Sequence, residues 1–225
     1  MRNSLSKILS KIGSLFNYVS NKVYISPFGD QKTLFRKDIG DSTNKLSFLD
    51  ENSVVFDVGG YEGQWASNIY GKYNSNIHIF EPVPNFSVEI QHRFEKNKKI
   101  KVNKFGLSDK TETKKISVGG DGSSTIKKIS EEKIDIKLVD VIEYIKQNNI
   151  RKIDLIKINI EGGEYALLNR LIDYGYMKNI NYVLVQFHNF FPEAKKEMQE
   201  IKDKLKNSHN PVYQYEFIWE LWKQN

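Results

Sequence analysis

A buried apolar run followed at once by a glycine-rich turn constrains this chain more than any other feature. Residues 54–58 (Val-Val-Phe-Asp-Val) indicate a strand, and three glycines follow within five residues. A second apolar run, residues 77–80, ends at Glu81. A glycine turn lets the backbone approach a ligand, and an acid that ends the next strand accepts both hydroxyls of a ribose. The pattern predicts a site for a cofactor that carries adenosine; the alternative is a tight strand-to-helix turn without a ligand.

The spacing of the glycines selects among such cofactors. Dinucleotide sites use G-x-G-x-x-G, because a pyrophosphate rests against bare backbone at a helix N-terminus. Here the glycines do not fit that spacing, and Asp57 would repel a nearby phosphate. S-adenosylmethionine (SAM) has no phosphate but carries an ammonium and a sulfonium cation, which an acid suits. We therefore predict a SAM site made by Asp57, Gly59, Gly60, Gly63, Glu81 and Pro82.

Strand-like and helix-like segments alternate from residue 53 onward, which predicts an α/β fold of the Rossmann-like, doubly wound type. The sheet is expected to be mostly parallel, with an antiparallel strand near the C-terminus over residues 212–219. Ligands of such sheets bind outside the carboxyl ends of the strands. The predicted strands cover 53–58, 77–81, 100–105, 154–160 and 182–188, and the predicted helices cover 63–71, 84–96, 139–148, 163–173 and 192–206.

Composition excludes several classes of protein. The 225 residues include no cysteine, so disulfide scaffolds, zinc–thiolate sites and cysteine nucleophiles are excluded. No apolar run approaches the roughly 20 residues that span a bilayer. The N-terminus also lacks the apolar core and cleavage site of a signal peptide. We expect a cytoplasmic protein.

The net charge of +6 is confined to the beginning of the chain. Residues 38–225 carry 27 basic and 27 acidic side chains, which argues against a nucleic-acid partner. Residues 1–22 have apolar side chains at helical spacing and predict a basic amphipathic helix. That helix either packs on its own domain as a lid or dimer contact, or lies on the inner membrane face. We expect a helical extension over residues 1–50 and a catalytic domain over 51–225.

A second distinctive segment is residues 153–164 (Ile-Asp-Leu-Ile-Lys-Ile-Asn-Ile-Glu-Gly-Gly-Glu). A lysine inside a buried strand is unfavourable unless it is paired. Lys157 could pair with Asp154, Glu161 or Glu164, which would be a structural role. The two glycines beside the acids indicate instead a close approach of the backbone to a ligand, and we favour a functional role for this segment. A glycine-rich stretch over residues 119–124 predicts either a mobile loop near the substrate or an anion-binding nest.

The order of these motifs resembles the FkbM-type methyltransferase family over roughly residues 52–192. The resemblance rests on DVGGYEGQW, IHIFEPVPNF, GLSD and IDLIKINIEGGE. It implies a class I SAM-dependent methyltransferase, with Ser108 and Asp109 near the adenine and with Glu161 and Glu164 at the reaction site. The family strand reads K-x-D-x-E-G, whereas this chain has Asn159 in place of the Asp. Asn159 can ligate a metal but cannot act as a base, so a divalent metal is left open.

The resemblance also implies O-methylation of a sugar hydroxyl, on a nucleotide-activated sugar or a surface-polysaccharide precursor. A hydroxyl is a poor nucleophile at neutral pH, so a general base is expected. His188, after the fifth strand, is one candidate and Glu161 is the other, with the second residue orienting the substrate. His188 could instead pack against Phe187 and Phe190. Alternative functions are a nucleic-acid methyltransferase and a non-enzymatic, membrane-associated protein.

Overall fold

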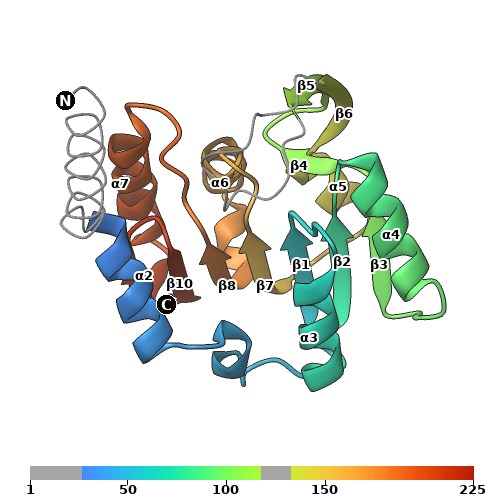
Figure 1. Ribbon diagram of the computed structural model, residues 1–225, viewed down its shortest axis with the longest axis horizontal. Helices are drawn as coiled ribbons and strands as arrows, with labels where there is room; N and C mark the ends of the chain where they lie inside the picture. Colours follow the sequence, from blue (N-terminus) through green and yellow to red (C-terminus); the bar gives the residue numbers. More distant parts are fainter. Residues whose placement is uncertain (1–26, 118–132) are drawn as a thin grey trace, which may run out of the picture.

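The computed structural model describes residues 27–117 and 133–225 of the chain. Its centre is a seven-stranded sheet in the order β3-β2-β1-β7-β8-β10-β9 (Figure 1). The strands β1, β2, β3, β7 and β8 are parallel, and β10 pairs antiparallel with both β8 and β9. Their bounds are β1 Val54–Val58, β2 Asn76–Phe80, β3 Ile100–Asn103, β7 Ile153–Ile158, β8 Ile180–Val185, β9 His209–Tyr215 and β10 Trp219–Gln224.

Helices cover both faces of this sheet, so the doubly wound prediction is confirmed. The apolar side chains of α3 and α4 pack with those of β1 and β2 in one core that includes Ile69, Ile77 and Ile90. The helices α5, α6 and α7 close the other face in a second core that includes Phe56 and Leu168. The helices are α3 Gln64–Tyr73, α4 Pro84–Phe94, α5 Val141–Gln147, α6 Glu164–Asp173 and α7 Ala194–Leu205, with the 3-10 helix η2 Tyr176–Asn179.

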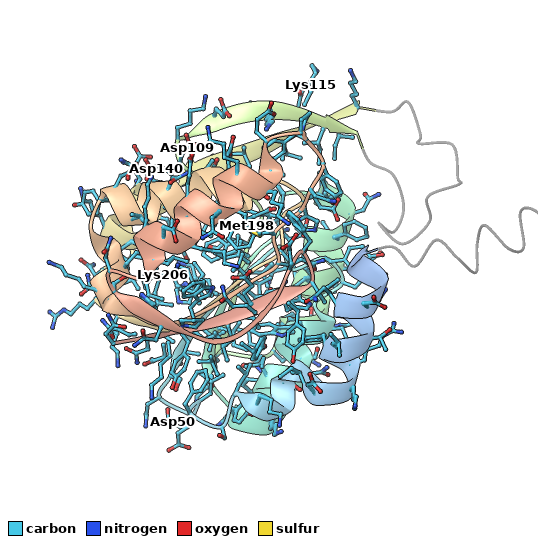
Figure 2. The ribbon with its side chains drawn as sticks, turned by 90° about the vertical axis from the view of Figure 1, so that its left-hand side faces the viewer. Asp50, Asp109, Lys115, Asp140, Met198 and Lys206 are labelled. Atoms are coloured by element: carbon cyan, nitrogen blue, oxygen red, sulfur yellow. The ribbon has the colours of Figure 1, made fainter. Side chains whose placement is uncertain are left out.

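The parallel strands place their carboxyl ends at one end of the molecule, which is the upper end in Figure 1. Asp50, which precedes β1, lies at the opposite end from Asp109 in Figure 2. A second sheet at the upper end has the order β4-β6-β5. It consists of β4 Gly106–Ser108, β5 Glu112–Ser117 and β6 Lys133–Asp140. The helix predicted over residues 139–148 begins later than expected, because Asp140 ends β6 and caps α5 by accepting the Ile142 N–H (2.7 Å).

The predicted C-terminal strand over residues 212–219 is two strands. The chain turns at residues 216–218 between β9 and β10, and Phe217 there has a φ of 56°. The antiparallel direction is as predicted.

The beginning of the described chain packs against this hairpin. Helix α2 (Pro27–Asp38) places Phe35 against Tyr213 and Tyr215, and the Tyr215 hydroxyl donates to Asp38 Oδ2 (2.9 Å). A 3-10 helix, η1 (Ser42–Lys45), leads from α2 toward β1. The amphipathic helix over 1–22 and the glycine stretch 119–124 lie outside the described residues. None of the described helices combines the length and apolar character needed to cross a bilayer.

Candidate active site

The glycine turn after β1 is shaped by close contacts within the protein. Gly59 has a φ of 88°, and a Cβ there would lie 2.0 Å from the carbonyl oxygen of Asn159. A Cβ on Gly60 would lie 2.4 Å from Ile79 Cγ2. Gly63 precedes α3 in the left-handed region, with a φ of 76°. The turn therefore needs glycine first for its own packing between β2 and β7, and the backbone is left bare at the carboxyl end of β1.

Glu81 lies directly after β2 and is 5% exposed. Its Oε2 accepts the Tyr61 N–H and its Oε1 accepts the Val83 N–H, both at 2.8 Å. Burial raises the pKa of the carboxyl, and the two N–H groups oppose that rise. Because each carboxylate oxygen can accept a second hydrogen bond, the two oxygens of Glu81 together retain two acceptor positions.

Asp57 and Lys157 form a buried ion pair between β1 and β7. Lys157 Nζ lies 2.8 Å from Asp57 Oδ1 and donates a second hydrogen bond to the Gly59 carbonyl (2.7 Å). The other oxygen of Asp57 is buried without a hydrogen-bond partner among the described residues. The expected pairing of Lys157 with Asp154, Glu161 or Glu164 is therefore wrong: the partner lies on the neighbouring strand, 100 residues away.

The turn from β7 to α6 carries three predicted residues in different environments. Asn159 is half-buried, and its N–H donates to the Val58 carbonyl (3.0 Å). Glu161 is exposed and has a φ of 53°, an uncommon conformation for a residue with a side chain. Glu164 is fully buried at the start of α6 and accepts the Gly162 N–H (2.8 Å). The structure thus turns Glu161 to the surface and Glu164 inward.

His188 follows β8 and is held by Glu164. The Glu164 Oε1 atom accepts the His188 backbone N–H (2.8 Å) and lies 3.1 Å from the imidazole Nδ1. Tyr165 donates its hydroxyl to the His188 carbonyl (2.7 Å). The imidazole also packs against Phe190, with ring centroids 5.0 Å apart. Both expectations for His188, an oriented base and an aromatic contact, are compatible with this geometry.

Ser108 and Asp109 end β4 and begin the segment after it. The Ser108 hydroxyl donates to Asp109 Oδ1 (3.0 Å). The start of β4 lies beside the turn after β2: a Cβ built on Gly106 would come 3.5 Å from Pro82 Cγ. The second sheet therefore borders the Glu81–Pro82 turn at the carboxyl end of β2.

The described residues contain no cluster of three or more histidine, aspartate or glutamate side chains arranged to hold a metal ion. The metal requirement left open by Asn159 therefore stays open.

Residues 57–215 match the family model of the methyltransferase FkbM domain, which spans more than half of the chain. The chain belongs to the FkbM methyltransferase family. No curated protein matches it in sequence. Solved structures that share the fold include two from bacterial RNA methylases. A candidate rRNA methylase from Clostridium thermocellum has a TM-score of 0.51 and 8% identity, covering 83% of this chain and 94% of its own. An rRNA methylase from Streptococcus thermophilus has a TM-score of 0.50 and 11% identity, covering 83% and 95%.

As an FkbM member, the protein is a methyltransferase with SAM as its cofactor. The residues present fit that cofactor. Glu81 offers a buried carboxylate with two unused acceptor positions, which suits the two hydroxyls of a ribose. The sheet edge beside it carries the bare backbone of the Gly59–Gly60 turn, and the described residues place no phosphate-binding lysine in that turn. When bound, SAM supplies an activated methyl group on a sulfonium.

The sequence predicted most of the residues of the candidate site, but it did not predict which of their side chains contact one another. Glu164 was expected at the reaction site, but its contact with His188 follows from the fold, since α6 and the end of β8 are joined only in space. Phe190 was considered only as packing for His188. A signal for it exists in the run Phe187-His188-Asn189-Phe190-Phe191, which places three phenylalanines within five residues at the end of a predicted strand.

Proposed function

We propose that this FkbM enzyme transfers the methyl group of SAM to a hydroxyl of a sugar, in a nucleotide-activated sugar or a surface-polysaccharide precursor. The observation that carries the proposal is the contact between His188 and Glu164 at the carboxyl end of β8. A neutral hydroxyl acceptor needs a group that takes its proton, whereas an amine or a thiolate acceptor does not depend on one in the same way.

The contact with Glu164 orients His188 for that role. A carboxylate beside Nδ1 favours the tautomer with its proton on Nδ1, which leaves Nε2 free to accept a proton. No described residue hydrogen-bonds to Nε2, and the His188 side chain is 10% exposed. In this proposal His188 takes the hydroxyl proton as the new O–C bond forms. Glu164 holds the imidazole and stabilises its positive charge. Glu161, exposed and outside this contact, is the rival base.

The cofactor residues receive separate roles in the proposal. Glu81 would accept the ribose hydroxyls, and the backbone at Gly59, Gly60 and Gly63 would lie along the methionine part. Asp57, buried against Lys157, would act mainly by fixing the turn. Ser108 and Asp109 would stand near the adenine, and Pro82 would shape the turn between them and Glu81. Together these residues position the donor, and positioning is the main contribution that a protein makes to a direct group transfer.

The nucleic-acid alternative rests on the rRNA methylases that share the fold. At 8% and 11% identity these structures carry the fold alone. The equal number of basic and acidic side chains in residues 38–225 argues against RNA as the methyl acceptor. Proteins that bind nucleic acid concentrate basic residues on the binding face, because the phosphate backbone supplies much of the affinity.

The proposal is tested by methyl transfer from SAM carrying a labelled methyl group. The acceptors are UDP- and GDP-hexoses, methyl hexosides and total RNA, each offered to the full-length protein and to His188→Gln. We expect label in a sugar fraction, bound through oxygen as shown by mass spectrometry, and loss of that label with His188→Gln. Label in RNA, with none in any sugar, would replace the proposal with the nucleic-acid alternative.

A further inference from the structure

A hollow of about 720 Å³ opens immediately beyond His188. Its wall is made by three segments that meet in space: α2, the segment from β8 to α7, and the turn from β9 to β10. The polar side chains on this wall are Gln31, Asn189, Lys195 and Glu216. The two residues that follow His188 in sequence, Asn189 and Phe190, both belong to it. The hollow therefore lies beside the segment that follows the carboxyl end of β8, and its wall begins one residue after the proposed base.

Phe190 is one of the residues that line this hollow. The residue is 63% exposed, which makes it the most exposed large hydrophobic residue in the described chain. On its other side, its ring lies 5.0 Å from the His188 ring, at 33°. The ring thus contacts the proposed base, and most of the residue remains exposed to solvent. Ligand sites are typically concave and lined by aromatic side chains together with a few polar groups, and Phe190 meets this description beside the proposed base.

The charge of the hollow is balanced. Lys195 Nζ lies 2.8 Å from Glu216 Oε1, so the lysine on the described wall is already paired with a carboxylate. A diphosphate would need cationic or N–H donors that are free to meet it. Gln31 and Asn189 instead offer amides, which donate and accept hydrogen bonds without charge. The described wall combines three phenylalanine residues, Phe190, Phe191 and Phe217, with uncharged polar groups and a neutralised ion pair.

We propose that this hollow binds the acceptor as a neutral glycosyl unit, with the C–H face of the sugar ring on Phe190 and its hydroxyls toward Asn189 and Gln31. The inference rests on the proposed sugar methylation and narrows it. The acceptor is a neutral sugar within a glycoside, as in a polysaccharide precursor, because the described wall offers a nucleotide diphosphate no unpaired cation. Sugar rings suit such a site because their C–H faces are apolar and their edges are polar.

The test is ligand-observed saturation-transfer NMR on the full-length protein with S-adenosylhomocysteine. The probes are methyl glycosides of glucose, galactose, mannose, rhamnose and N-acetylglucosamine, with the matching UDP- or GDP-hexoses as the anionic arm. Phe190→Ala removes the ring, and Phe190→Tyr keeps it. Tyr174→Ala is the matched control, because Tyr174 is another exposed aromatic (47%) and lies at the C-terminal end of α6, outside the wall of the hollow.

We expect at least one methyl glycoside to bind through its ring C–H protons. Its affinity should fall at least fivefold in Phe190→Ala, recover in Phe190→Tyr and stay unchanged in Tyr174→Ala, while the affinity for S-adenosylhomocysteine is the same in all four proteins. Binding of no methyl glycoside, binding indifferent to Phe190→Ala, or tighter Phe190-dependent binding of the nucleotide sugars would overturn the inference.

Failure of the proposed function gives a different result. In that case the methyl glycosides bind in the Phe190-dependent way, yet no labelled methyl group reaches any sugar. If instead the wild-type protein methylates a sugar and Phe190→Ala does so with the same KM, sugar methylation stands and the hollow is not the acceptor site.

Discussion

The ammonium group of Lys157 lies 2.8 Å from Asp57 Oδ1, and the two residues are directly opposite each other in the parallel register of β1 and β7. The side chains are 6% and 0% exposed. Burial raises the pKa of Asp57, while the positive charge of Lys157 lowers it. The same ammonium group binds the Gly59 carbonyl, so a single side chain joins two strands and fixes the first residue of the cofactor turn.

Lys157→Met should destabilise the protein strongly. The substitution keeps the length of the side chain but leaves the Asp57 carboxylate buried without a cation, which costs about 3–5 kcal/mol in comparable buried pairs. Urea unfolding at pH 7.5 measures the change. The double variant with Asp57→Asn should recover a large share of the loss, because it removes the uncompensated charge. Two losses that simply add would show that the pair is not coupled.

Gly59→Ala should destabilise the fold and weaken the binding of S-adenosylhomocysteine. The new Cβ would lie 2.0 Å from the Asn159 carbonyl oxygen, and the φ of 88° is unfavourable for alanine. We expect a loss of at least about 2 kcal/mol in urea unfolding. Gly71→Ala is the control, since a Cβ in that position of α3 meets nothing within 4 Å. It should stabilise the helix by about 0.5–1 kcal/mol. Equal behaviour of the two variants would contradict the packing described at Gly59.

His188→Gln should lower kcat by about 10²–10⁴-fold, the usual contribution of a general base. The KM for SAM should stay unchanged, because His188 lies away from the β1–β2 edge. Steady-state kinetics on the identified acceptor measure both constants. His92→Gln is the control, because His92 is a surface histidine with a side chain that is 78% exposed.

Glu164→Gln should also lower kcat, and the double variant with His188→Gln should be no slower than His188→Gln alone. Residues that act as one unit lose their effect together, so their kinetic losses do not add. A larger loss in Glu161→Gln than in His188→Gln would transfer the role of base to Glu161.

The stability of the protein should fall between pH 6.5 and pH 4 through His78. Its Nδ1 is hydrogen-bonded to the Tyr144 hydroxyl (2.7 Å), and burial lowers the pKa of His78 from 6.5 to about 4. The neutral form is favoured in the folded state, so the contribution is complete above pH 6.5 and disappears as the pH falls through the folded pKa. The shift corresponds to about 3 kcal/mol. Urea unfolding of the wild type and of His78→Gln from pH 7.5 to 4 should show a difference that closes on acidification. A difference that is constant over this range would contradict the assignment.

The arrangement of the central sheet was predictable because its strands are buried on both faces and read as apolar runs. β1 and β3 fall within the predicted segments, β2, β7 and β8 overlap theirs but begin one or two residues earlier, and every predicted helix is present. The smaller sheet was not predicted. β6 alternates charged and apolar side chains and is exposed along much of its length, so it lacks the continuous apolar signal of the core strands.

The other differences between the predicted and the observed structure arise from pairing between segments that are distant in the sequence. The aromatic alternation of the C-terminal segment continues through Trp219 and Trp222, and residues 216–218 contain no glycine, proline or asparagine to mark the turn. Lys157 was correctly expected to be paired, but its partner depends on which strand lies beside β7. In the same way, Glu164 and His188 belong to one site only because α6 begins beside the end of β8.

The central claim is that the carboxyl ends of β1 and β2 hold SAM through Glu81. Isothermal titration calorimetry of S-adenosylhomocysteine tests it most directly, on the wild type, Glu81→Ala and Glu89→Ala, with NAD(P) titrated alongside. Glu89 is an exposed carboxylate on α4 and serves as the matched control. We predict binding in the micromolar range, weakened at least tenfold in Glu81→Ala and unchanged in Glu89→Ala. Binding of NAD(P) in place of S-adenosylhomocysteine, or equal affinity in all three proteins, would contradict the account.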